Sequence, residues 1–221
     1  MKTLLKRETI IKSALALILA LGLAAVFIPK ASVPARVINP KAGEQVAVFA
    51  GGCFWGIEAV FEHVRGVKDV TVGYSGGDAK TASYEQVSGG STGHAEAVRI
   101  IYDPSQVSYD QLLKVFFYVA HDPTELNRQG PDTGTQYRSV IFYTSEEQKR
   151  QALAYIDRLN QTKVYNRPVV TQVTALASFY QAEAYHQDYA VHHPDAPYIV
   201  THDLPKVANL RTQFPDLYVA R

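Results

Sequence analysis

Two hydrophobic periodicities alternate along residues 45–143, and this alternation limits the folds open to the chain. Apolar residues at consecutive or alternate positions indicate strands, and apolar residues repeated every three or four positions indicate helices. The order is strand, helix, strand, strand, helix, strand, with strands at 45–50, 67–74, 96–102 and 138–143 and helices after Cys53 and Ser108. We therefore predict an α+β fold: a two-layer α/β sandwich with a ferredoxin-like β-α-β-β-α-β core, helices on one face of the sheet and a C-terminal extension.

Helix starts are marked by two capping boxes. Ser108 with Gln111 precedes one helix, and Ser145 with Gln148 precedes another that runs to about Asn160. In such a box the serine side chain accepts a backbone N–H three residues on, and the glutamine side chain accepts in return.

The remaining segments divide into loops and two further elements. The glycine-rich residues 75–94 and the polar residues 121–137 are predicted to form long loops of the kind that carry function. A strand is expected over 169–175 and a short helix over 181–190.

The N-terminal residues have the pattern of a targeting segment. Lys2, Lys6, Arg7 and Lys12 precede the apolar run 14–28. We interpret residues 1–28 as a signal peptide or an uncleaved signal anchor, followed by a linker at 29–44. The positive flank would stay in the cytoplasm, which places the domain in the bacterial periplasm or cell envelope. A buried first helix of the domain is the alternative.

Composition favours one globular enzyme-sized domain. Hydrophobic residues make up 47% and charged residues 19%, and the formal net charge is +1, so no nucleic-acid partner is indicated. We assign residues 45–216 to one catalytic domain and 217–221 to a short tail, and we expect a monomer.

Cys53 is the only cysteine of the chain, which excludes an internal disulfide and a multi-thiolate zinc site. It follows Gly51-Gly52 and precedes the first turn of a helix, where free N–H groups lower a thiol's pKa. The glycines would let a substrate approach the backbone. We interpret Cys53 as a nucleophile; a structural thiol in a strand-to-helix turn is the alternative.

Glu96 and Trp55 are the other residues that the pattern singles out. Glu96 shares strand parity with Val98 and Ile100, so it points toward the core, where burial would keep it protonated as a general acid. A glutamate turned to solvent at the strand edge is the alternative. Trp55 lies off the apolar stripe of its helix and fits either a pocket wall or ordinary packing.

Taken together, these motifs resemble those of the A-type peptide methionine sulfoxide reductases over roughly residues 45–216. The stretches that carry the resemblance are GGCFWG, GYSGG, YEQVSGGSTGHAE, YDPSQVSY, HDPTELNRQGPDTGTQYRS, AEAYHQDY and PYIV…PKVANLR. GCFWG, TGHAE and GTQYRS in this order and spacing are highly specific.

The resemblance implies a role for each matching position. Cys53 corresponds to the nucleophile and Glu96 to the proton donor. The substrate-binding positions are Phe54, Trp55, Tyr84, Tyr137, Asp132 and His186. The two tyrosines would hydrogen-bond the sulfoxide oxygen, and the aromatic pair would hold the substrate methyl group. The implied reaction is reduction of methionine-S-sulfoxide, free or in proteins, through a Cys53 sulfenic acid, in repair of oxidised proteins under oxidative stress.

Two departures from many relatives qualify the resemblance. Residues 205–221 hold no resolving cysteine, so we predict that an external thiol, small or thioredoxin-like, reduces the sulfenic acid, with no cofactor or metal. Ala184 stands where relatives commonly have an acidic residue.

Two other functions remain open at this point. A cysteine hydrolase or acyl-transferase would use His94 or His186 as a base for Cys53. A membrane-tethered module would bind hydrophobic peptides through the aromatic residues without turnover.

Overall fold

A computed structural model describes residues 39–221, and the predicted signal or anchor segment 1–28 lies outside the described residues. Of the predicted linker 29–44, only the part from residue 39 on is described. Within residues 39–221, no helix is both long enough and apolar enough to span a bilayer.

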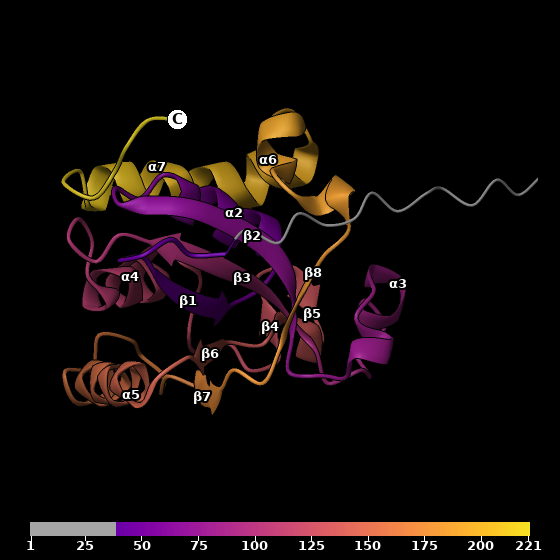
Figure 1. Cartoon of the computed structure of the whole chain (residues 1–221), viewed down its shortest axis with the longest axis horizontal. Helices are drawn as coiled ribbons and strands as arrows, with labels where there is room; N and C mark the ends of the chain where they lie inside the picture. Colours follow the sequence, from indigo (N-terminus) through magenta and orange to yellow (C-terminus); the bar gives the residue numbers. More distant parts are fainter. Residues whose placement is uncertain (1–38) are drawn as a thin grey trace, which may run out of the picture. The chain divides into compact units, whose positions relative to one another are not determined.

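The centre of the fold is a six-stranded sheet (Figure 1). Its order is β7-β6-β1-β3-β2-β8, and neighbours are antiparallel except β6 and β7. The strands are β1 (Gln45–Ala50), β2 (Val67–Ser75), β3 (Ala95–Tyr102), β6 (Val140–Tyr143), β7 (Gln172–Ala175) and β8 (Phe179–Gln181). The prediction is confirmed at the level of a mixed fold, in which helices and one largely antiparallel sheet share a domain.

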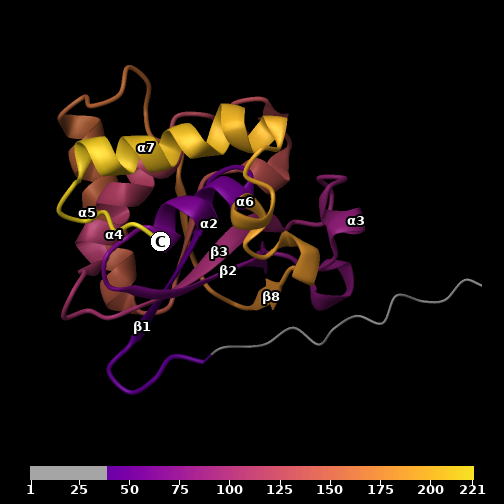
Figure 2. The same ribbon diagram turned by 90° about the horizontal axis from the view of Figure 1, so that it is seen from above.

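Four longer helices contribute to one large apolar core. They are α2 (Phe54–Glu62), α4 (Tyr109–Val115), α5 (Glu146–Gln161) and α7 (Leu204–Gln213). Helix α7 lies beside α2 in both views (Figures 1 and 2). The opposite sheet face buries only a small cluster around Val48, Ala97 and Phe142. Alternate residues of β1 and β3 therefore divide between two unequal apolar layers.

The capping boxes form to different degrees. Ser108 and Gln111 exchange both hydrogen bonds, and α4 continues as a π-helical turn over Phe116–Ala120. Ser145 accepts the Gln148 N–H, but the Gln148 side chain accepts from Thr144 instead of closing the box.

The predicted helix over 181–190 is wrong. That segment consists of the end of β8, a 3-10 turn (Ala184–His186) and the four-residue helix α6 (Tyr189–His192). Tertiary hydrogen bonds override the helical pattern. The Gln187 side chain bonds both the N–H and the carbonyl of Val72, and Asp188 takes a left-handed φ of 53°.

The two predicted loops contain short elements, and the C-terminus packs on the fold. Residues 75–94 include α3 (Tyr84–Val87), and residues 121–137 include the pair β4 (Arg128–Gln129) and β5 (Asp132–Thr133). In the segment predicted as a tail, Val219 N–H donates to the His63 carbonyl at 2.8 Å.

Candidate active site

One cavity of about 200 Å³ brings together seven of the eight predicted site residues. It is lined by Cys53, Phe54, Trp55, Tyr84, Glu96, Asp132, Tyr137 and Tyr198. These residues come from α2, α3, β3, β5 and the turns before β6 and α7, so segments far apart in sequence converge on it.

Cys53 is the N-cap residue of α2 and is 8% exposed. The sequence predicts that Gly51 and Gly52 let a substrate approach the backbone. In the structure, the space beside each glycine is instead filled by a side chain of the protein. A Cβ on Gly51 would lie 2.8 Å from the His121 ring, and one on Gly52, where φ is +102°, would lie 2.5 Å from the Gln129 side chain. The turn that presents the sulfur is thus supported by the loop that follows the π-helical turn Phe116–Ala120.

The thiol differs from the sequence prediction in its acidity. Burial raises the pKa of Cys53 well above its ordinary value, and the negative charges of Glu96 and Asp203 raise it further. A hydrogen bond from the Trp55 backbone N–H lowers the pKa, as the helix start predicts, but the other effects outweigh it. The resting sulfur is therefore a neutral thiol at pH 7.

Glu96 points into the core, as its strand parity predicts, and is 2% exposed. Its Oε2 accepts the Phe54 backbone N–H at 3.1 Å. Burial raises the pKa of this carboxyl to about 8, although that hydrogen bond lowers it, and Asp132 adds to the rise. Glu96 is therefore mostly protonated at neutral pH and can act as a proton donor.

Two tyrosine hydroxyls face the same cavity. Burial raises the pKa of both Tyr84 and Tyr137, and the charge of Glu96 raises each further. Both hydroxyls therefore keep their protons and remain hydrogen-bond donors across the physiological pH range. With Glu96 they give the cavity lining three groups that carry a proton and can donate it in a hydrogen bond.

The apolar wall is held from behind by residues outside the cavity. The Trp55 ring stacks on Tyr189, with centroids 3.8 Å apart and planes at 8°. Its indole N–H donates to Nδ1 of His186 at 3.3 Å. His186 is 1% exposed and does not line the cavity, so it supports Trp55 and is the one predicted binding residue that stands behind the wall.

Sequence reasoning missed Tyr198 and Tyr189. The Tyr198 hydroxyl donates to Asp132 Oδ2 across the cavity, and the Tyr198 ring meets Trp55 edge-on. Tyr198 lies in the PYIV stretch and Tyr189 in AEAYHQDY, two motifs that carry the resemblance, but neither tyrosine was assigned a role. Tyr198 lies outside any predicted element, and Tyr189 lies in the segment whose predicted helix is wrong, so no local pattern indicates which way either side chain points.

His121 beneath Gly51 predicts a loss of stability in acid. Burial lowers the pKa of this imidazole to about 4, although the Phe116 carbonyl acts in the opposite sense, so protonation favours the unfolded chain. Stability from this group is complete above the unfolded pKa of about 6.5 and is lost as pH falls toward 4, by up to about 3 kcal/mol. Urea unfolding at pH 7 and pH 4.5 measures it. In a His121→Gln variant the free energy of unfolding should fall less between these two pH values than it does in the native chain. A His192→Gln variant, changed at an exposed site, should show the same fall as the native chain. Equal drops in all three proteins contradict the assignment.

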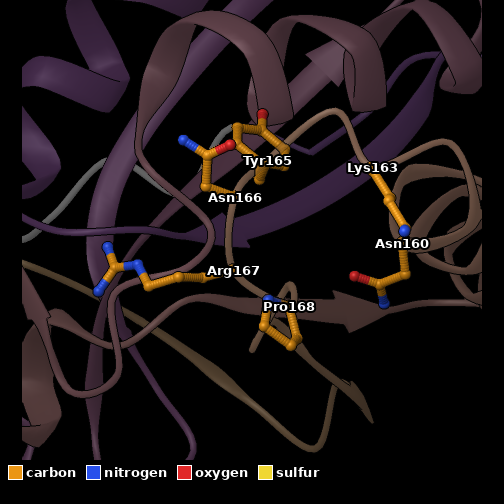
Figure 3. Close-up of a pocket in the computed structure, with 6 residues that line it drawn as sticks. All are labelled: Asn160, Lys163, Tyr165, Asn166, Arg167 and Pro168. Carbon is orange, nitrogen blue, oxygen red and sulfur yellow. The ribbon is translucent and has the colours of Figure 1, made fainter.

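A larger hollow of about 640 Å³ lies away from the predicted residues (Figure 3). Lys163 and Asn160 lie on one side of it and Asn166 and Arg167 on the other. It contains neither cysteine nor carboxylate, so it lacks the groups for redox chemistry. Within residues 39–221, no cluster of three or more His, Cys, Asp or Glu residues is arranged to hold a metal ion.

Known proteins resemble this chain over most of its length. The family described as peptide methionine sulfoxide reductase matches residues 45–217. Peptide methionine sulfoxide reductase MsrA 2 of Synechocystis is 55% identical over 83% of this chain and 87% of its own. The MsrA 2 of Mesorhizobium japonicum is 56% identical over 80% of this chain and 90% of its own.

Two solved structures share the fold. Reduced Mxr1 from Saccharomyces cerevisiae has a TM-score of 0.67 at 31% identity and covers 73% of this chain and 92% of its own. Methionine sulfoxide reductase A of Corynebacterium diphtheriae has a TM-score of 0.61 at 34% identity and covers 70% of this chain and 77% of its own.

Proposed function

This chain belongs to the peptide methionine sulfoxide reductase family, so it is an oxidoreductase that reduces methionine sulfoxide with thiols, and we propose that Cys53 and Glu96 carry out the reaction. The observation that supports this most directly is the single cavity that holds one thiol, one mostly protonated carboxyl and two tyrosine hydroxyls. We propose the S epimer as its substrate, free or in oxidised proteins.

The neutral site contains the protons that the reaction requires. Glu96 gives its proton to the sulfoxide oxygen, helped by hydrogen bonds from Tyr84 and Tyr137, and this makes the substrate sulfur electrophilic. The Cys53 sulfur attacks as its own proton passes to the Glu96 carboxylate. The attack forms a bond between the Cys53 sulfur and the substrate sulfur. The hydroxyl group then moves from the substrate sulfur to the Cys53 sulfur as that S–S bond breaks, which releases methionine and leaves Cys53 as a sulfenic acid. Methionine sulfoxide is reduced to methionine by two electrons, Cys53 is oxidised by two, and Glu96 ends protonated.

A second thiol must then reduce the sulfenic acid. Because Cys53 is the only cysteine, that thiol comes from outside the chain, and we propose a thioredoxin-like protein or a small thiol. It condenses with the sulfenic acid to a mixed disulfide and water, and a further thiol releases Cys53 by exchange.

A histidine-dependent hydrolase finds no support in this geometry. Neither His94 nor His186 lines the cavity. The His94 ring bonds the Gly77 N–H through Nδ1 and the Asp78 carbonyl through Nε2, which leaves no free nitrogen to act as a base.

Two further proposals concern the whole chain. From the basic flank and apolar run at residues 1–28, we place the enzyme outside the cytoplasm, secreted or anchored.

From the strand order β6-β1-β3-β2 with antiparallel neighbours, we assign a ferredoxin-like core; this order supports the assignment, and β7 and β8 extend the sheet.

A single turnover without reductant tests the proposed reaction. Incubation with the S epimer of an N-blocked methionine sulfoxide should release one methionine per protein and leave one oxygen on the peptide that contains Cys53, detected by mass after trapping the sulfenic acid. The R epimer should give neither product. Methionine release with an unmodified Cys53 contradicts the mechanism.

A further inference from the structure

Helix α3, which supplies Tyr84 to the cavity, is only four residues long. A single turn has little stability of its own, so its position depends on contacts from outside the helix. Tyr84 is the first residue of that turn, and the preceding N-cap residue, Ser83, makes no side-chain capping bond. The position of the Tyr84 hydroxyl therefore depends on whatever holds this N-terminus.

The carboxylate of Glu183 holds it. Its Oε1 accepts the Tyr84 backbone N–H at 2.9 Å, and its Oε2 accepts the hydroxyl of Tyr74 at 2.9 Å. Tyr74 is fully buried in β2, directly opposite Glu96 in the strand register. One side chain thus ties the start of α3 to the strand beside the proposed proton donor.

Glu183 is itself fixed to the sheet. Ala182 N–H donates to the Val72 carbonyl at 3.0 Å, and the Gln187 side chain bonds both backbone groups of Val72. The residues on both sides of Glu183 are therefore hydrogen-bonded to β2, which makes this segment a fixed support for the short helix α3.

The Glu183 carboxylate also lies near His186, the residue that supports Trp55. Because Nδ1 of His186 accepts the Trp55 indole N–H, the neutral ring carries its proton on Nε2. That nitrogen lies 4.0 Å from Glu183 Oε2 and has no hydrogen-bond partner among the described residues. At this distance the contact with His186 is weaker than the hydrogen bonds to Tyr84 and Tyr74. Of these two tyrosines only Tyr84 lines the cavity, so Glu183 acts on the site mainly through Tyr84.

We propose that Glu183 is a positioning residue, which holds the Tyr84 hydroxyl where it can donate to the sulfoxide oxygen. The inference rests on the proposed function, because it assigns Tyr84 a part in the reaction. It also gives Glu183, in the AEAYHQDY stretch, a role beside that of His186.

A double-mutant cycle with Tyr84→Phe tests the proposal in the full-length protein. Glu183→Ala should lower kcat/KM for the sulfoxide by about 10-fold or more, mainly through kcat, as expected for losing hydrogen bonds to a charged group. In the Tyr84→Phe background, where no hydroxyl remains to be placed, the same change should cost less than about 3-fold. Glu183→Gln keeps an oxygen for the Tyr84 N–H and should restore most of the activity.

Controls separate positioning from loss of folding. Glu85→Ala removes an equal charge from an exposed site beside Tyr84 and should leave the rate unchanged. If Glu183→Ala does not fold, Glu183→Asp replaces it, since aspartate keeps the charge but is one methylene too short to reach the turn. An equal cost of the Glu183 change in both backgrounds overturns the positioning role alone. A native chain that does not reduce the sulfoxide overturns the proposed function, and the inference with it.

Discussion

A Cys53→Ser variant is expected to lose sulfoxide reduction, falling at least ~10⁴-fold below the native chain. A serine hydroxyl is a weak nucleophile toward sulfur and cannot carry the transferred oxygen as a sulfenic acid does. No second cysteine can substitute for it, since the chain has only one. Serine is similar in size, so the cavity and its other lining residues should persist.

The measurement is methionine release with excess dithiothreitol, together with the dissociation constant for the sulfoxide. Turnover should vanish while the dissociation constant stays within a few-fold of native. This pair of results also separates the reductase from a peptide-binding module, which would bind without turnover in either protein. Sulfoxide reduction that persists in Cys53→Ser would exclude the mechanism.

Glu96→Gln is expected to lower kcat by ~10²–10⁴, the usual contribution of a general acid. Glutamine keeps an oxygen to accept the Phe54 N–H, so the fold around the site should hold. It has no proton to give to the sulfoxide oxygen, however, and none to exchange with the thiol. The loss should therefore appear in the chemical step and not in substrate binding.

The pH dependence gives the same test a second reading. Glu96 acts in its protonated form, and burial raises its pKa to about 8, so the native rate should fall as pH rises through 8. The Glu96→Gln variant should lack that decline. Glu58→Gln is a matched control: Glu58 is also buried and accepts a backbone N–H, that of Asp188, but it lies outside the cavity. A loss in Glu58→Gln as large as in Glu96→Gln would show that any buried carboxyl matters and would remove the special role of Glu96.

The sequence predicted those parts of the fold that local patterns determine. The Ser108 capping box depends on residues three apart, and the direction of Glu96 follows from strand alternation alone. The prediction of a helix over 181–190 failed because the conformation of that segment is set by hydrogen bonds to Val72, more than a hundred positions away. A periodicity rule cannot detect a partner at that separation.

The site divides in the same way. The residue types were predictable from motifs, but the acidity of the thiol was not, because it depends on burial and on carboxylates from β3 and the turn before α7. The helix start does lower the pKa of Cys53, and only the packed structure reveals how far desolvation exceeds it. Tyr198 and Glu183 likewise gain their roles from three-dimensional contacts.

The stack of Trp55 on Tyr189 has a practical consequence, because Trp55 is the only tryptophan of the chain. All indole fluorescence of the protein therefore originates at the wall of the cavity. Occupation of the cavity by a ligand, or conversion of the adjacent sulfur to another oxidation state, alters the surroundings of this single fluorophore. The native enzyme thus carries its own optical probe, and rapid-mixing measurements can follow binding and oxidation separately without any attached label.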